Sequence, residues 1–114
     1  MSDLDGTLAA LADPTRRGVV ELLRRRPRRA GELAESLGTS PPAMSRHLRV
    51  LRTTGLVDED HRGEDARVRV YHLRPEPFHV LRRWLDEVEK FWTLELASFQ
   101  DHLERTRGTG KRRR

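Results

Sequence analysis

Three arginines at intervals of three, Arg46, Arg49 and Arg52, are the side chains with the plainest chemical capacity in this chain. A guanidinium is always charged and donates hydrogen bonds from a planar fork, which matches phosphate oxygens and the two acceptors on the edge of guanine. No nucleophile–base pair, paired carboxylates or phosphate loop accompanies them, since Ser45 and His47 are two residues apart on a predicted helix and do not face each other. The pattern indicates recognition of a polyanion, and the sequence predicts no enzyme.

A helix predicted over residues 41–54 must position these arginines. Ser40 is a favourable N-cap, and Pro41 suits the first helical position, where no internal N–H bond is needed. An earlier predicted helix over residues 30–37 ends at Gly38, a residue that readily adopts the left-handed conformation found after helices. The sequence therefore predicts two helices joined by a tight glycine turn.

The two faces of the second helix differ in chemistry. Met44, Leu48 and Leu51 recur at helical spacing and are predicted to face a core. Arg46 and Arg49 point the other way. A rigid helix that presents arginines outward just after a glycine turn is typical of the reading helix of a helix-turn-helix, which enters the major groove of DNA.

Each residue of this region has an expected role. Arg46 is expected to read a base edge, and Arg49 and Arg52 to bind phosphates. Small side chains let the helix approach closely, hydroxyls at the turn meet a phosphate, and His47 packs or positions the helix. Each arginine could otherwise be a solvated surface charge. The predicted DNA contacts are Thr39, Ser40, Pro42, Ala43, Ser45, Arg46, Arg49, Arg52 and Arg62.

Beyond Gly55 the apolar period changes from helical to alternating. Residues 56–60 and 67–73 are predicted strands around a polar turn, and a two-stranded hairpin must lean on the helices because it is marginal alone. Both faces of the second strand carry apolar residues, so either face is a candidate for burial. Arg62, in the turn, is either a minor-groove contact or a plain turn residue.

The remaining segments are predicted helices. Leu4, Leu8 and Leu11 share one face of a first helix, and a second helix runs from Pro14 to about Arg26. The last and longest helix runs from Pro75 to about Glu104. Its long aromatic-rich stripe is expected to bury itself against a second subunit, the alternative being that it completes the core of a monomer. The predicted dimer contacts are Leu4, Leu8, Trp84, Leu85, Val88, Trp92, Leu96 and Phe99.

Composition bounds the protein class. The chain has 114 residues and a formal net charge of +5, and an excess of positive charge attracts nucleic acid. We predict one domain over residues 1–105 and a basic, disordered tail over residues 106–114. There is no cysteine, which excludes disulfides and thiolate metal sites. Without an apolar run of membrane-spanning length or a signal sequence, the expected location is cytoplasmic.

Several of these segments together resemble the ArsR/SmtB family of winged-helix repressors. The matching motifs are Leu11–Arg17, Ala30–Ala34, Ser45–Leu48 with Leu51, and Gly55–Val57 before the wing. The resemblance covers about residues 8 to 103. It implies a mainly α winged helix-turn-helix with a small β-hairpin, dimeric through its first and last helices. It also implies a repressor on a palindromic operator that an inducer, often a metal ion, releases from DNA.

Two departures from the family pattern bear on function. The thiolate pair of the family's metal sensors would fall within Gly31–Leu37, where there is no cysteine, and the metal pattern of the last helix is also unmatched. We therefore predict no metal and no cofactor, and the inducer stays unnamed. The wing loop is also longer and more acidic than is usual. Its two carboxylates either pair with neighbouring arginines or weaken the contact of the wing with DNA.

The sequence is compatible with three functions. The leading one is a dimeric, sequence-specific transcriptional repressor that binds double-stranded DNA. The alternative is a non-specific architectural DNA-binding protein, which a competition assay with unrelated DNA would distinguish because only the repressor prefers one palindrome. A protein-interaction module without DNA binding is disfavoured by the outward arginines, Arg46 and Arg49.

Overall fold

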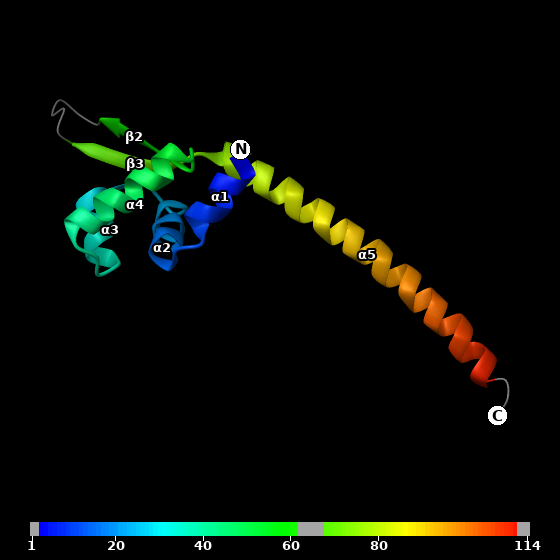
Figure 1. Cartoon of the computed structure of the whole chain (residues 1–114). Helices are drawn as coiled ribbons and strands as arrows, with labels where there is room; N and C mark the ends of the chain where they lie inside the picture. The colour runs from blue at the N-terminus through cyan, green and yellow to red at the C-terminus, as the bar shows by residue number, and fades with distance from the viewer. Residues whose placement is uncertain (1–2, 62–67, 112–114) are drawn as a thin grey trace. The chain divides into compact units, whose positions relative to one another are not determined.

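The computed structural model describes residues 3–61 and 68–111, with side chains described as far as Arg107 in the last helix. The chain divides into two compact units, Met1–Leu81 and Arg82–Arg114. The first unit holds four helices, a small sheet and the start of the last helix, and the second continues that helix (Figure 1).

The first two helices are α1, Asp3–Leu11, and α2, Pro14–Leu23. Asp13 is the N-cap of α2, and its Oδ2 accepts a hydrogen bond from the backbone N–H of Arg16 at 3.0 Å. Helix α2 ends three residues earlier than the predicted Arg26. The predicted start of α2 at Pro14 is confirmed.

Helices α3, Ala30–Ser36, and α4, Pro41–Thr53, form the predicted helix-turn-helix. Gly38 follows α3 with φ +63° and Gly55 follows α4 with φ +78°. After each helix, the N–H groups of the glycine and of the following residue donate hydrogen bonds to carbonyls of the last helical turn. Thr39 N donates to Ala34 O at 2.9 Å, and Leu56 N donates to Leu51 O at 2.9 Å. These closures set the direction in which the chain enters α4 and leaves it.

The sheet has three strands rather than the predicted two. β1, Arg28–Arg29, pairs antiparallel with β3, Arg69–Leu73, which also pairs with β2, Val57–His61. The order is therefore β1-β3-β2. The sequence could not indicate β1, because two residues carry no alternating pattern and the strand exists only through its partner.

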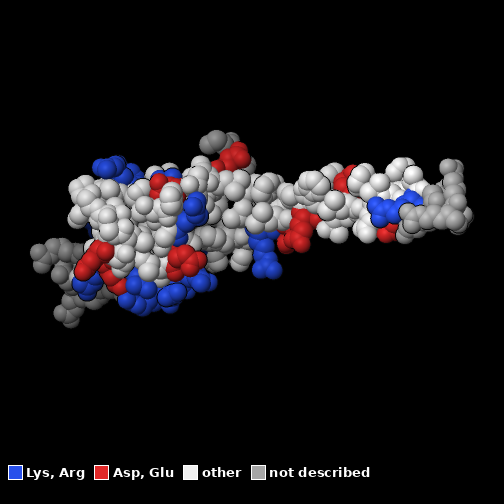
Figure 2. Space-filling view, turned by 90° about the horizontal axis from the view of Figure 1, so that it is seen from below, with Lys and Arg blue, Asp and Glu red and all other residues white. Residues whose placement is uncertain are grey.

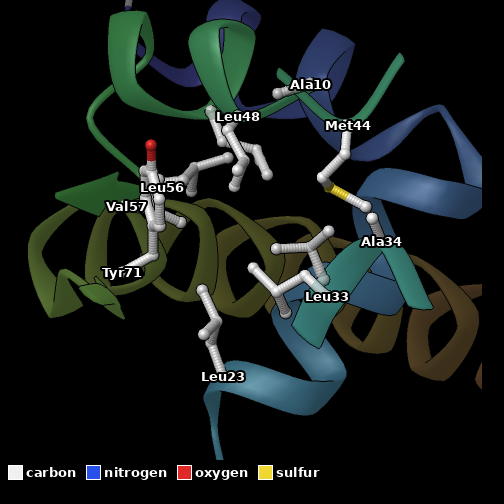
Figure 3. Close-up of a cluster of buried hydrophobic side chains, with 11 residues drawn as sticks. Ala10, Leu23, Leu33, Ala34, Met44, Leu48, Leu56, Val57 and Tyr71 are labelled. Carbon is white, nitrogen blue, oxygen red and sulfur yellow. The ribbon is translucent and has the colours of Figure 1, made fainter. Parts of the chain in front are cut away.

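The core of the first unit lies among the helices and one face of this sheet, since α4 packs against α2, α3 and β2. Figure 3 shows buried side chains from all of these elements pointing toward one another. The predicted inner face of α4 is confirmed, and Tyr71 shows that its own face of β3 is the buried one. The buried apolar residues are Ala10, Val19, Leu23, Leu33, Ala34, Met44, Leu48, Leu51, Leu56, Val57 and Tyr71.

Helix α5, Pro75–Lys111, is longer than predicted. The sequence placed its end near Glu104, but the helix continues for seven residues. Contacts one turn apart span the predicted end: Arg105 bonds Asp101 Oδ2 at 2.6 Å, and Thr106 Oγ1 donates to His102 O at 3.0 Å. The division into a domain and a basic tail stays a prediction. Among the described residues, no helix is long and apolar enough to cross a membrane.

Candidate nucleic-acid interface

The outer face of α4 collects most of the predicted DNA contacts. Because Met44, Leu48 and Leu51 are turned into the core, the residues between them face solvent. The exposed predicted contacts are Ser40, Pro42, Ser45, Arg46, Arg49 and Arg52, the half-buried ones are Thr39 and Ala43, and Arg62 lies outside the described residues.

The start of α4 combines a hydroxyl cap with two prolines. Ser40 Oγ accepts the N–H of Ala43 at 3.3 Å, so this hydroxyl is already used as the N-cap. Pro41 and Pro42 carry no N–H groups. Hydroxyl groups and the side chains that follow must therefore supply most of the polar contacts at this end of the helix.

Arg46 and Arg49 are the two arginines of α4 with no ion pair to another described residue. Both are exposed on the outer face of the helix. A guanidinium without an internal carboxylate keeps all of its donors for an external acceptor. These two side chains therefore have the chemistry that base edges and phosphates require.

Arg52 differs from them, because its Nη1 lies 3.1 Å from Oε1 of Glu59 on β2. The Glu59 side chain is only 13% exposed, against 46% for Arg52. The ion pair joins the last turn of α4 to the wing. From the sequence, Arg52 is predicted to be a phosphate ligand and Glu59 has no predicted role. No local sequence pattern indicates which helix residue lies beside a strand.

Glu59 also influences Tyr71, its direct neighbour across β2 and β3. Burial, followed by the hydrogen bond and negative charge of Glu59, raises the pKa of the Tyr71 hydroxyl above its ordinary value. The second carboxylate oxygen of Glu59 is buried and has no hydrogen-bond partner. Arg52 is thus the main compensation for a largely buried negative charge.

His47 ties α4 to the start of α2. Its Nδ1 lies 3.4 Å from Nη1 of Arg16 and 3.9 Å from Oδ2 of Asp13. The backbone N–H of Arg16 lowers the pKa of the Asp13 carboxyl from its ordinary value of 3.8, with further lowering by the charges of His47 and Arg16. Since His47 contacts both residues, its position agrees with the predicted packing role.

Arg16 and Arg17 have structural roles that the sequence did not reveal. Arg16 Nε donates to Ala10 O at 2.7 Å and Arg17 Nη1 to Leu11 O at 2.8 Å, so both arginines satisfy carbonyls at the end of α1. The one available signal was their place in the motif Leu11–Arg17. They hold α1 to α2, and Arg16 also contacts His47 of α4.

The predicted dimer contacts present a largely exposed apolar surface. Leu8 on α1 is exposed, and along α5 Trp92 and Phe99 are 59% and 60% exposed. The exposed residues of this set are Leu8, Trp84, Leu85, Trp92, Leu96 and Phe99, and the half-buried ones are Leu4 and Val88. Phe91, which was not in the predicted set, is also exposed and widens the apolar arc of α5, whereas the exposed Leu94 lies on the opposite side of the helix from Trp92.

Charge is unevenly spread over the first unit. Figure 2 shows Lys and Arg side chains forming a stretch along one edge of the displayed face, beside fewer Asp and Glu. Within residues 3–61 and 68–111, no group of three His, Cys, Asp or Glu side chains is placed to hold a metal ion.

The chain is similar in sequence to several known proteins. Residues 13–59 match the family described as bacterial regulatory protein, arsR family. The chain is 44% identical over 100 residues to the HTH-type transcriptional regulator Rv2034 of Mycobacterium tuberculosis, covering 88% of each chain. It is 31% identical over 61 residues to the transcriptional repressor SdpR of Bacillus subtilis, covering 54% of this chain and 68% of SdpR.

The fold is also found among solved structures. An ArsR-like transcriptional regulator from Rhodococcus sp. RHA1 superposes with a TM-score of 0.73 at 29% identity, covering 87% of this chain and 91% of that one. The crystal structure of another ArsR family transcriptional regulator gives a TM-score of 0.72 at 35% identity, covering 81% and 98%. The chain therefore belongs to the ArsR family of winged helix-turn-helix, DNA-binding transcriptional regulators.

Proposed function

We propose that this protein is a homodimeric repressor that binds a palindromic DNA operator. The observation that carries the proposal is the pair of exposed arginines, Arg46 and Arg49, on a capped helix whose other face is locked into the core. A rigid helix of this kind can enter the major groove without losing its own packing. The name of the related SdpR as a transcriptional repressor supports the direction of regulation.

The second subunit is inferred from the apolar surface of α5. Five large apolar side chains on one side of α5 are more than a third exposed in the single chain: Trp84, Leu85, Phe91, Trp92 and Leu96. A contiguous apolar surface of this kind is a typical protein interface. We assign it, together with Leu8 of α1, to contact with a second copy. A two-fold axis then explains why the operator is a palindrome.

Within the dimer, Arg46 reads the operator. Two copies of α4 enter successive major grooves about 34 Å apart, and each Arg46 bonds two acceptors of a guanine. Arg49 binds a neighbouring phosphate, as do the hydroxyls at the turn before α4. The Arg52 side chain, which is about half exposed, also contributes to phosphate binding while it remains paired with Glu59.

The signal that releases the DNA is not a metal at the thiolate position of the family's metal sensors. Residues 31–37 contain no cysteine to bind one. Adding Zn²⁺, Ni²⁺ or Cd²⁺ to the complex should leave operator affinity unchanged. A metal-dependent fall in affinity that a chelator reverses would contradict this part of the proposal.

The test is selection of duplexes by the full-length protein from a random-sequence double-stranded library, followed by fluorescence anisotropy. We expect one palindromic sequence with half-sites one helical turn apart, which unrelated duplex fails to displace. Sedimentation of the free protein should show a dimer. Equal affinity for the selected and unrelated duplexes would favour the non-specific architectural function. A monomer that binds a single half-site would contradict the proposed dimer.

A further inference from the structure

A hollow of about 600 Å³ opens beside the outer face of α4 in the first unit. Residues from four elements line it: Ser45 of α4, Gly31 of α3, Arg69 and Tyr71 of β3, and Arg29 of β1. The hollow exists because β1 joins the sheet, which brings residues 28–31 beside β3. None of its lining residues except Ser45 was a predicted DNA contact.

The charge of this hollow is one-sided. Its two charged lining residues, Arg29 and Arg69, are both cationic, and no carboxylate lines it. Both arginines are exposed, and within the described parts of the chain neither has an ion pair. Ser45 adds a hydroxyl donor. Two arginines without a carboxylate partner and one hydroxyl group around an open space can bind an anion. In DNA that anion is the backbone phosphate.

We propose that the hollow binds a backbone phosphate of the DNA strand that borders the groove occupied by α4. This inference rests on the proposed function, because the duplex brings the phosphate. Ser45 is common to the hollow and to the outer face of α4, so a strand passing α4 also passes the hollow. Arg29 and Arg69 hold the phosphate from the sheet, and the site fixes the register of α4 without reading sequence.

Substitutions at Gly31 can change the charge of the hollow without a steric clash. A Cβ at this position would meet no heavy atom within 4 Å, and the residue lies in the first turn of α3. Glutamate there suits the positive end of the helix dipole, so Gly31→Glu should fold at least as well as the parent. Gly31→Gln is its neutral match in size, and Gly31→Lys reverses the added charge.

The experiment measures the affinity of these full-length variants for the selected palindromic duplex at fixed salt. We expect Gly31→Glu to bind about tenfold more weakly than Gly31→Gln, and Gly31→Lys to bind at least as tightly as Gly31→Gln. Thermal unfolding of each variant, without DNA, serves as the check on folding. Equal affinities of the three variants would overturn the proposal.

Salt dependence gives a second readout. Affinity falls as salt rises, so a plot of the logarithm of the association constant against log salt concentration has a negative slope. Arg69→Ala and Arg29→Ala should each make this slope less steep by about one per half-site, because one fewer counterion is released from each half-site. Arg25→Ala removes an exposed arginine outside the hollow and is the matched control. If Arg25→Ala changes the slope by the same amount, the effect follows from the net charge of the protein, and the proposed phosphate site is wrong. If the parent binds no duplex at all, the proposed function fails instead.

Discussion

Arginines in this protein perform two different tasks that their residue type does not distinguish. Arg16 and Arg28 are held by contacts within the chain, Arg16 to carbonyls of α1 and Arg28 to Glu32 at 3.0 Å. Arg46 and Arg49 are exposed with no ion pair inside the described structure. Only the second kind can exchange water for a nucleic acid without first breaking a bond to the protein. The contribution of an arginine to DNA binding is therefore decided by its neighbours.

Arg46→Ala should reduce discrimination between the selected palindrome and a variant with changed half-site guanines by about 1–3 kcal/mol. The truncated side chain can no longer bond the two acceptors of guanine, whereas phosphate contacts remain. Anisotropy titrations with both duplexes at the same salt concentration measure the difference. Arg49→Ala is the control, since losing a phosphate contact weakens both duplexes alike. If Arg46→Ala discriminates as the parent does, Arg46 is not the base-reading residue.

Asp13 predicts a pH dependence of stability. Its pKa in the folded protein is below the ordinary value of 3.8, chiefly because it accepts the N–H of Arg16. A group with a lowered folded pKa stabilises the fold above its unfolded pKa, and that contribution is lost as pH falls through the folded pKa. Asp13→Asn keeps a cap acceptor but cannot ionise. The melting temperature of the parent should therefore exceed that of Asp13→Asn at pH 7, with the gap closing below pH 3.8.

Asp86→Asn is the matched control for this experiment, because Asp86 is exposed on α5 and has no ion pair with any described residue. The difference in melting temperature between Asp86→Asn and the parent should not change with pH in the way expected for Asp13→Asn. A gap for Asp13→Asn that is constant between pH 7 and pH 3 would show that the charge of Asp13 does not support the fold.

Among the elements, the ion pair between Arg52 and Glu59 links α4 to β2 of the wing. Helix α4 and strand β2 are joined in sequence by the glycine closure at Gly55, and the ion pair adds a side-chain connection between them. Because Glu59 is largely buried, the pair has a greater effect than an exposed surface pair, whose contribution is small. The predicted phosphate ligand is thus also a structural connection.

Arg52→Ala should destabilise the fold by about 1–2 kcal/mol, because it leaves the Glu59 carboxylate buried without its cation. Denaturant unfolding measures the change. Arg49→Ala, on the same helix but without an ion pair, should stay within about 0.5 kcal/mol of the parent. The double variant Arg52→Ala with Glu59→Gln should recover part of the loss. Equal stability of Arg52→Ala and Arg49→Ala would contradict the connection.

At the scale of the whole molecule, the second unit is a helix whose apolar surface is not covered within the single chain. Trp92 and Phe99 are each more than half exposed, and apolar residues spaced by threes and fours along α5 place them on one continuous stripe. A reader of palindromic DNA needs two copies of α4. The proposed dimer therefore relates the exposed apolar stripe of α5 to the candidate DNA-binding surface of α4.

Trp92→Glu should convert the dimer to a monomer at micromolar concentration, because removing a central aromatic contact from an interface commonly costs about 2–4 kcal/mol. Analytical ultracentrifugation measures the mass, and anisotropy should show a parallel loss of operator affinity. Thr93→Glu introduces the same side chain at an exposed neighbouring position off the stripe and should remain a dimer. A dimeric Trp92→Glu would place the interface elsewhere.

The sequence by itself determined the features whose causes lie within a few residues. Ser40 and Pro41 begin α4, Gly38 and Gly55 end helices, and Met44, Leu48 and Leu51 define the buried face, because capping, left-handed closures and helical periodicity are local effects. The helix-turn-helix and its outward arginines, on which the family resemblance also depends, followed from these signals.

Only the tertiary structure decided the features that depend on partners distant in sequence. Strand β1 exists through its pairing with β3, Tyr71 selects the buried face of the sheet by entering the core, and Glu59 engages Arg52 across the α4–β2 contact. The hollow at Gly31 has the same origin. The physical reason is that packing and ion pairing act between neighbours in space, and a linear pattern of residue types does not specify which distant residues become neighbours.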